Sequence, residues 1–494
     1  MPSMIAAAPA DRLQYQLSEG LNENEFLQQG KVAAHLLLRS GKFPRILVAF
    51  PAGNSGVGLW FAETPRNVAW IIPSAPEPVI SNDAKGRPLY GIVARAELTT
   101  PTLEIRKAVL SSVRVLRDYQ AIGTVPALVE TKPIIKGDTI SWSRDRLDGA
   151  PGYSIALQVV HGSLDGGRLI AAADGRIGLR ITALSGETPL TPFPAAGLLN
   201  GRAAIDPGAR DALRFLSYRE KFLAGSWRFN TYFGRDTLMS VRLLMPALTP
   251  DAVETGLAAV LSRLSPDGQV AHEEDIGEFA VLDHMKTDGS RSDAPVYDYK
   301  MIDGNYLLGP VASAWLLDDP RSRERAFRFL AGLDLREHGA RKRRGADLVA
   351  NLKLVLRSAA PFAADQRATN LISLKPGVPV GEWRDSNTGL GGGRYPYDVN
   401  AILVPAALRS AARLYAKGLL DPYLTKEDRL LFARASKMAD IWSMSAPVFF
   451  RVEVDRSTAV RDVTSYAAAV GVPSQAANAS LSATGTRFYA VSLD

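Results

Sequence analysis

The sequence predicts an α+β multidomain protein: an N-terminal β-sandwich followed by a helical toroid of the (α/α)6 type that is incomplete at its C-terminus. Three observations predict this. Short apolar runs between turn residues fill the first third of the chain, a segment rich in proline and glycine follows, and a helical period then takes over. The length of 494 residues exceeds what one hydrophobic core needs, which also favours several domains.

Residues 1–185 are expected to form a mainly β-sandwich domain. Apolar runs at 46–50, 69–72 and 155–160 alternate with turn signals made of glycine, asparagine and proline. Many short strands separated by such turns are typical of a sandwich. One helix is expected to interrupt the strands, around residues 104–118.

A linker is expected over residues 186–204, because residues 186–201 hold three prolines and three glycines. The toroid is expected over 205–494, and its helical period is clearest at 250–264. Further helices are expected at 208–223, 236–248, 305–318, 320–333, 346–358, 399–417 and 425–443. A closed ring of six hairpins needs about twelve helices, roughly four more than the sequence shows. Since residues 485–494 are expected to be a strand or an extended loop, the toroid is predicted to be incomplete.

The composition excludes several kinds of chemistry. The absence of cysteine rules out disulfides, thiolate metal sites and thiol catalysis. The five histidines never show the spacing of a helical metal pair, so we predict no metal and no other cofactor. The net charge is +7, but the dense basic run at 341–344 is expected to be a solvated surface, and no nucleic-acid partner is predicted. Acid–base chemistry must therefore rely on carboxyl groups.

The sequence gives no indication of a membrane anchor. No apolar run approaches the ~20 residues of a membrane span. Residues 1–16 have neither a basic start nor a long apolar stretch, so no intact secretory signal is expected. A periplasmic or secreted location and a cytoplasmic one both stay open.

Four loops in the second half of the chain combine carboxylates with aromatic side chains. They are residues 227–237, 272–275, 297–305 and 381–387. In a ring of antiparallel helical hairpins the inner helices start at one rim, so loops that enter them would gather around one mouth. Cleavage of a glycosidic bond usually employs two carboxyl groups, and flat aromatic faces pack against sugars. The loops therefore predict a site for an oligosaccharide or polysaccharide.

Asp385, in the segment Gly381-Glu382-Trp383-Arg384-Asp385-Ser386, is the predicted catalytic acid. Such an acid must stay protonated near neutral pH, which requires an apolar or anionic neighbourhood. Trp383 and Glu382 could provide it, whereas Arg384 would oppose it if its guanidinium faced Asp385. The candidate aromatic platforms are Trp227, Tyr232, Trp383 and Tyr395.

The same acids also have purely structural explanations. Asp236 and Asp385 could each cap the segment that follows them. Glu273, Glu274 and Asp275 could form a solvated loop, since most acids are exposed. Each of these acids is therefore a weaker candidate for a functional site when taken alone than as a member of the four acid-bearing loops.

Two pairs of motifs resemble known enzymes. Phe233-Gly234-Arg235-Asp236-Thr237, followed by Ser265-Pro266-Asp267-Gly268, resembles the pattern of glycogen-debranching amylo-glucosidases and their six-hairpin relatives. Residues 381–386, followed by Pro396-Tyr397-Asp398-Val399-Asn400-Ala401, are similar to the acid loop and next inner helix of trehalases and processing α-glucosidases. The domain order also resembles that of bacterial glucoamylases. The resemblance covers about residues 205–420 and departs from the pattern at Arg384, which separates the tryptophan from the acid.

The resemblance implies an inverting glycoside hydrolase that acts on α-linked glucosides, with Asp385 as general acid. It implies that Arg235 and Asp236 hold the sugar at the cleaved bond, and that Trp383 and Asn400 line the same pocket. The whole predicted substrate-binding set is Tyr232, Arg235, Asp236, Glu273, Glu274, Trp383, Arg384 and Asn400.

The general base is left open by the sequence. The related families place it late in the toroid, so it is expected beyond residue 494 or at Glu273 or Glu274. One alternative is a carbohydrate-binding protein or a truncated toroid without turnover. Another is a polysaccharide lyase or unsaturated-uronyl hydrolase on the same fold. A second carboxyl group about 6.5–9.5 Å from Asp385 would distinguish an inverting hydrolase from these.

Overall fold

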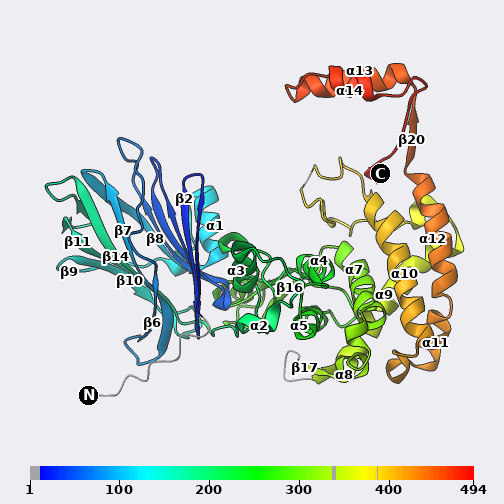
Figure 1. The fold of residues 1–494 in the computed structure, drawn as a ribbon, viewed down its shortest axis with the longest axis horizontal. Coiled ribbons are helices and arrows are strands. Elements are labelled where there is room, and N and C mark those ends of the chain that lie inside the picture. Colours follow the sequence, from blue (N-terminus) through cyan, green and yellow to red (C-terminus); the bar gives the residue numbers. More distant parts are fainter. Residues whose placement is uncertain (1–11, 336–340, 387) are drawn as a thin grey trace. The chain divides into compact units, whose positions relative to one another are not determined.

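A computed structural model describes residues 12–335, 341–386 and 388–494 (Figure 1). The chain forms two compact units: unit 1 comprises Met1–Ala259 and Glu273–Asp298, and unit 2 comprises Val260–His272 and Tyr299–Asp494. Sheets and helices are both present, as the predicted α+β multidomain class requires, whereas the toroid stays a prediction. Residues 1–11 lie outside the described residues. They include most of the segment in which no intact secretory signal is expected.

Unit 1 is built on two antiparallel sheets. The eight-stranded sheet has the order β1-β2-β3-β4-β5-β8-β13-β12, and the six-stranded sheet has the order β6-β7-β14-β11-β10-β9. The first sheet comprises β1 (Leu13–Glu19), β2 (Asn22–Gln29), β3 (Val32–Arg39), β4 (Arg45–Phe50), β5 (Ser55–Phe61), β8 (Thr102–Ser112), β12 (Ser163–Asp165) and β13 (Arg168–Ile170). The second comprises β6 (Glu77–Asn82), β7 (Pro88–Thr99), β9 (Ile134–Lys136), β10 (Thr139–Arg144), β11 (Tyr153–His161) and β14 (Arg176–Ser185).

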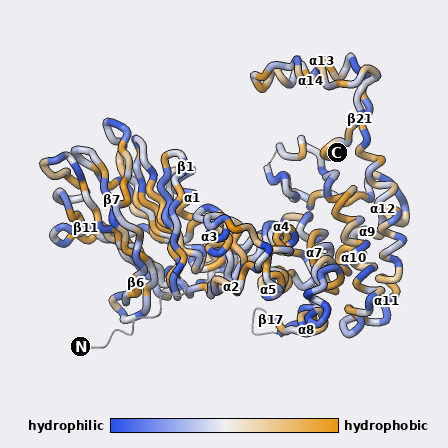
Figure 2. Tube along the Cα trace, in the orientation of Figure 1, coloured by the Kyte–Doolittle hydropathy of each residue, from blue (hydrophilic) through white to orange (hydrophobic). Residues whose placement is uncertain are grey.

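One hydrophobic core takes side chains from both sheets. Leu36 and Leu38 of β3 and Ile155 and Leu157 of β11 are fully buried in it. They occupy alternate positions because successive side chains of a strand point to opposite faces. Figure 2 shows that hydrophobic residues recur along the strands of unit 1. The strands predicted at 46–50 and 155–160 are confirmed, whereas the run at 69–72 contributes an isolated bridge at Ile71.

Helices cover the outer face of the eight-stranded sheet, the face turned away from this shared core. Near β3 and β4 the cover consists of α1 (Val113–Ile122), η3 (Trp227–Phe229) and α6 (Glu278–Thr287). Near β1 and β2 it is α3 (Pro207–Phe215), whose Phe215 packs against Leu13 and Phe26. The helix predicted at 104–118 was wrong in its first half, because those residues pair with β5 as strand β8. Helix α1 begins after Ser112, whose side chain accepts a hydrogen bond from the Arg114 amide.

The predicted linker lies within unit 1 and contains short structure of its own. Helix α2 (Ala195–Leu198) falls inside it, and bridges join Pro192 to Tyr218 and Leu199 to Leu248. The remaining elements that belong to unit 1, wholly or in large part, are η1 (Ala52–Asn54), η2 (Ala127–Val129), α4 (Gly234–Leu244), α5 (Pro250–Leu261), β15 (Glu273–Asp275) and β16 (Val296–Asp298). Helices that sequence assigns to the second domain therefore cluster with the sheets.

Unit 2 is mainly helical, as its period predicts. Helix α7 (Asp303–Ser313) continues into the π-helical turn η4 (Ala314–Asp318), and the π-helical turn η8 (Asp398–Leu403) continues into α10 (Val404–Ala416). Helix α10 packs against α7, α9 and α12 (Figure 1). The other elements up to residue 449 are η5 (Pro320–Ser322), α8 (Ala326–Ala331), β17 (Leu333–Leu335), β18 (Arg341–Arg343), α9 (Arg344–Ala364), η7 (Ala368–Asn370), β19 (Tyr395–Pro396), η9 (Asp421–Tyr423), α11 (Lys426–Phe432) and α12 (Ala435–Phe449).

The last part of unit 2 is a ribbon that leaves α12 and returns. Strand β20 (Arg451–Val454) pairs with β21 (Thr486–Tyr489), and the two helices α13 (Arg456–Ala469) and α14 (Gln475–Ser480) lie between them in sequence. Strand β22 (Ser492–Leu493) then pairs with β19. The expected extended structure at 485–494 is confirmed, whereas α13 and α14 were not predicted. Within the described part of the chain, no helix has both the length and the apolar character to cross a bilayer.

Candidate functional site

The predicted acid loop, residues 381–386, contains a buried carboxyl group, Glu382. Its side chain is fully buried, and its Oε1 accepts a hydrogen bond from the Arg384 amide at 2.9 Å. Burial, followed by the charge of Asp398, raises the pKa of Glu382 to about 7. Burial also raises the pKa of Asp398, which begins η8. Glu382 and Asp398 therefore form a carboxyl pair in which burial and the charge of Asp398 favour the protonated form of Glu382.

Asp385 lies in the same loop but in a different environment. Its side chain is exposed to solvent, as is that of Trp383, which is 52% exposed. The Arg384 guanidinium lies over the Trp383 ring, 4.3 Å from its centroid. The loop thus presents a carboxyl and an aromatic side chain to solvent. The buried, anionic neighbourhood that sequence reasoning expected around Asp385 surrounds Glu382 instead.

Asn400, in the first turn of η8, binds the backbone of two other segments through its side chain. Its Oδ1 accepts from the Ile372 amide at 2.7 Å, and its Nδ2 donates to the carbonyls of Ile372 and Pro396 at 2.9 and 2.8 Å. These bonds occupy both ends of the amide, and the side chain is fully buried. Asn400 therefore fixes two backbone segments beside the carboxyl pair, while its predicted contact with substrate stays untested.

An equivalent asparagine occurs at the start of α7. Asn305 follows Asp303 by two residues, as Asn400 follows Asp398, and its Oδ1 accepts from the Val270 amide at 2.7 Å. The repeated Asp-x-Asn pattern therefore marks two helix starts at which an asparagine ties down an earlier loop. Sequence reasoning missed this role, although the repeat itself was visible.

Further polar contacts connect these loops within unit 2. Asn351 of α9 donates through Nδ2 to the carbonyls of Gly268 and Asn305, at 3.0 and 3.1 Å. The Ile302 amide donates to the Gly381 carbonyl at 2.6 Å, which attaches the acid loop to the residue before α7. The acid loop is therefore held by backbone at its first residue and by the carboxyl of Glu382 at its second.

The second predicted acid cluster lies in unit 1 and is also buried. Glu274 is 1% exposed; it forms an ion pair with Lys221 and accepts from the Thr231 hydroxyl at 3.2 Å. Glu273 forms an ion pair with Arg114, yet burial raises its pKa to about 7. The explanation of a solvated loop is therefore wrong for these two acids.

The other predicted residues of unit 1 surround the start of α4. Arg235 and Asp236 are half-buried in its first turn, and Phe233 occupies the N-cap position that we considered for Asp236. Tyr232 is fully buried and Trp227 is 8% exposed. Neither ring is therefore open to solvent as a sugar platform, unlike the exposed Trp383.

The predicted site residues fall into two sets. The first set, Trp383, Arg384, Asp385 and Asn400, belongs to unit 2, as does Glu382, which was not predicted as a site residue. The second, Tyr232, Arg235, Asp236, Glu273 and Glu274, belongs to unit 1. The gathering of their loops around one mouth stays a prediction from the sequence.

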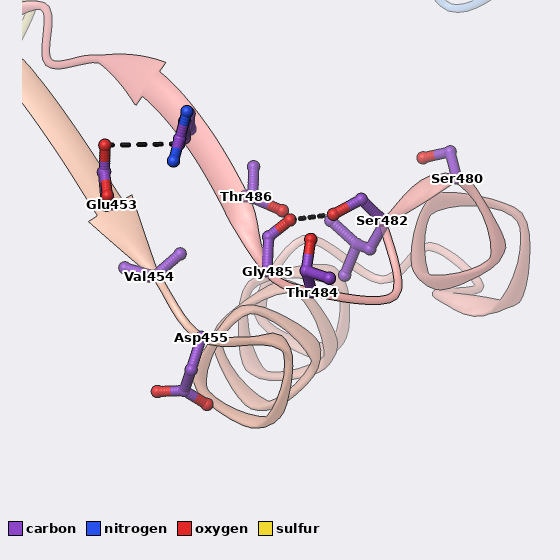
Figure 3. A pocket seen from close by; sticks show the side chains of 10 residues that line it. Glu453, Val454, Asp455, Ser480, Ser482, Thr484, Gly485 and Thr486 are labelled. Atoms are coloured by element: carbon purple, nitrogen blue, oxygen red, sulfur yellow. Dashed lines mark hydrogen bonds and ion pairs between the residues drawn. The ribbon is translucent and has the colours of Figure 1, made fainter.

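A cavity of about 970 Å³ lies at the C-terminal ribbon of unit 2 (Figure 3). Its acids serve local structure: Glu453 pairs with Arg487 at 3.2 Å, and Asp455 caps α13 by accepting from the Thr458 amide at 2.9 Å. We therefore place the candidate catalytic site at the acid loop rather than in this cavity.

Comparison with known proteins yields little. No family model matches the chain, and no curated protein matches its sequence. One solved structure similar to it is described as "Putative kojibiose phosphorylase from human microbiome", with 7% sequence identity and a TM-score of 0.32. The match covers 86% of this chain and 61% of that chain, so this chain spans about three fifths of that structure's length.

Proposed function

We propose that the chain is a glycoside hydrolase that protonates a glycosidic oxygen from the loop 381–386, with Asp385 as the proton donor. Its substrate is an oligosaccharide or polysaccharide that contains α-linked glucosyl units. The observation that supports this best is the composition of one loop. It combines an exposed carboxyl group, an exposed tryptophan and a buried carboxyl group whose pKa is raised to about 7.

Each part of the loop has a chemical use. The donor must reach the glycosidic oxygen, and the exposed Asp385 meets that requirement. The Trp383 ring is half exposed although Arg384 lies over one of its faces, and its exposed part can pack against the C–H face of a sugar. Asp398 and Glu382 keep negative charge and a proton beside the loop near neutral pH. For an inverting reaction, a second carboxyl group must activate water on the opposite face of the sugar.

Glu382 is the second candidate donor, and its raised pKa favours it. An effective general acid has a pKa near the pH at which it works. Glu382 is fully buried, so it could serve only if the loop moved to expose it. The two carboxyl groups can be distinguished by experiment.

The test compares Asp385→Asn with Glu382→Gln on natural α-glucans and on a dinitrophenyl α-glucoside. Loss of the general acid should lower glucan hydrolysis by about 100-fold or more, because acid catalysis contributes roughly that much. It should affect the dinitrophenyl substrate far less, because that leaving group departs without protonation. We expect this pattern from Asp385→Asn, with sugar binding retained.

Asp440→Asn, an exposed acid of α12, is the matched control and should leave activity unchanged. The same pattern from Glu382→Gln, with Asp385→Asn fully active, would transfer the role of donor to Glu382. A wild-type chain that binds glucans but cleaves none would instead indicate a carbohydrate-binding protein.

A further inference from the structure

A second cavity, of about 680 Å³, opens on the outer face of the eight-stranded sheet in unit 1. It is bordered by strands β2, β3 and β4, by the last turn of α1 and by η3. Its volume is within the range of roughly 300–1,000 Å³ found for small-molecule sites. Its lining includes Glu19, Asn22, Asn24, His35, Arg39, Phe43, Arg45, Gln120, Trp227, Arg228 and Phe229.

Three arginines give this cavity an excess of positive charge. Arg39 and Arg45 are direct cross-strand partners, an arrangement that is unfavourable for like charges without a counterion. Arg228 adds a third cation, and burial together with the charges of Arg39 and Arg228 lowers the pKa of Arg45 to about 10. Among the described residues that line the cavity, Glu19 is the one carboxylate.

None of these arginines is neutralised by the part of the chain that the structure describes. Arg39, Arg45 and Arg228 form no ion pair with a described carboxylate, whereas Arg114 and Arg144 of the same unit do. Guanidinium groups that have no ion pair within the protein are suited to bind a carboxylate or a phosphate from a ligand.

Buried polar atoms of four residues that line the cavity also lack partners. Asn22 Oδ1, His35 Nδ1, Gln120 Oε1 and Arg45 Nε are all buried without a hydrogen bond from the described residues. Such atoms are uncommon in folded proteins, and each calls for a partner such as a ligand. Three of the four are acceptors and one is a donor, so a matching ligand must both donate and accept hydrogen bonds.

The protonation of His35 can be assigned from its neighbours. Asn24 donates through Nδ2 to the Leu17 carbonyl at 2.9 Å, so its Oδ1 accepts from His35 Nε2, also at 2.9 Å. Nδ1 is therefore the bare nitrogen. Burial lowers the pKa of His35 to about 3, so the ring stays neutral and Nδ1 needs a donor. A hydroxyl group supplies one, whereas a phosphate dianion or an isolated carboxylate does not.

Aromatic side chains complete the lining. Phe43 and Phe229 are 59% and 47% exposed, whereas Trp227 is mostly buried. Exposed rings of this kind pack against the C–H faces of sugars. We propose that this cavity binds an anionic saccharide: its acid group contacts the three arginines, its hydroxyls donate to His35 and its neighbours, and its ring packs on the phenylalanines.

The residues that line this cavity belong to unit 1 and the acid loop belongs to unit 2, and the proposed binding does not depend on the proposed hydrolase activity. Binding can be measured by titration calorimetry on the full chain with trigalacturonate, glucose 6-phosphate, maltotriose and inorganic phosphate. We expect at least one of the two acidic saccharides to bind about tenfold or more tightly than both maltotriose and phosphate. The affinity should fall as ionic strength rises.

Two substitutions test the assigned contacts. Arg228→Ala removes an exposed cation and should weaken binding of the acidic saccharide by roughly tenfold or more, the size expected for a charge-assisted hydrogen bond. Gln120→Leu should weaken it by a smaller factor. Arg106→Ala, an exposed arginine of β8 outside the cavity, is the matched control.

Three results would overturn the proposal. One is the absence of binding by both acidic saccharides. Another is inorganic phosphate or maltotriose that binds as tightly as they do. The third is an equal effect of Arg228→Ala and Arg106→Ala. Asp385→Asn should leave this binding unchanged, so failure here and failure of the proposed hydrolase activity are distinguishable.

Discussion

At the scale of single residues, solvent exposure separates two carboxyl groups of one loop. Glu382 is buried beside Asp398, and Asp385 three positions later is exposed. The motif in the sequence locates this loop correctly as a place where carboxyl groups and an aromatic ring meet. It does not show which carboxyl group is buried, because that depends on η8, which begins twelve residues after the loop's last residue.

The buried pair predicts how stability depends on pH. The pKa of Glu382 rises from 4.5 to about 7 on folding, so between these values the folded chain holds more protons than the unfolded chain. The contribution of Glu382 to the free energy of unfolding is complete below about pH 4.5 and is lost as pH rises through 7. Glu382→Gln should therefore reduce the fall in unfolding free energy between pH 5 and pH 8 by an amount of the order of 2 kcal/mol.

Urea unfolding at both pH values measures this fall. Glu273 and Glu25 have pKa values raised in the same direction, so both variants should keep part of the wild-type dependence of the unfolding free energy on pH. Only the difference between wild type and Glu382→Gln reports on Glu382. Asp440→Asn serves as the control, and an equal pH dependence of all three chains would contradict the assignment.

At the scale of elements, buried asparagines decide how the loops of unit 2 attach to its helices. The helices themselves follow from the apolar period, which α9 and α10 display over long stretches. The attachments do not follow from it, because Asn351 and its partners Gly268 and Asn305 are far apart in sequence. The Asp-x-Asn repeat is the one local trace of this arrangement.

The same limit explains the error at strand β8. A local apolar pattern at 104–118 fits a helix, but residues 102–104 pair with β13 and residues 105–112 with β5, so this stretch becomes a strand. Tertiary pairing overrides the local preference there. A helix begins only at Val113, where the pairing with β5 ends.

Asn351→Ala tests the importance of these attachments. It removes the donor from two carbonyls, and unmet buried groups of this kind cost roughly 1–3 kcal/mol. We expect a loss of that size in the unfolding free energy, measured by urea denaturation. Asn370→Ala is the control, because its amide bonds an exposed carbonyl; its effect should stay within about 0.5 kcal/mol. Equal losses in both variants would contradict the assigned role of Asn351.

At the scale of the whole molecule, the chain leaves unit 1 after Ala259, returns at Glu273 and leaves again after Asp298. The returning segment carries α6, whose Glu278 is fully buried. Its Oε1 accepts from Arg144 at 2.7 Å and from the Leu147 amide at 3.2 Å. The proline-rich segment is visible in the sequence, but these distant contacts, which join helices to sheets, are not.

These contacts predict the behaviour of a chain cut at the expected linker. A fragment of residues 205–494 would lose Ser111, Arg144 and Leu147, the three residues that bind the Glu278 carboxylate. It would also expose Leu282 and Trp227, which pack on the outer face of the sheet. We expect this fragment to aggregate or to lack a cooperative thermal transition in circular dichroism. A soluble fragment that melts like the full chain would contradict this.

The short pairing of β19 with β22 also has a consequence for the order of assembly. Ser492 donates its hydroxyl to the carbonyl of Leu390, 102 residues earlier in the chain. The Arg394 and Tyr397 amides likewise donate to carbonyls near the chain's last strand. During synthesis on the ribosome, these bonds can form only after residue 493 has emerged. The segment that leads into Asp398 is therefore among the last parts of unit 2 to reach its final hydrogen bonding, long after α7 and α9 can have formed.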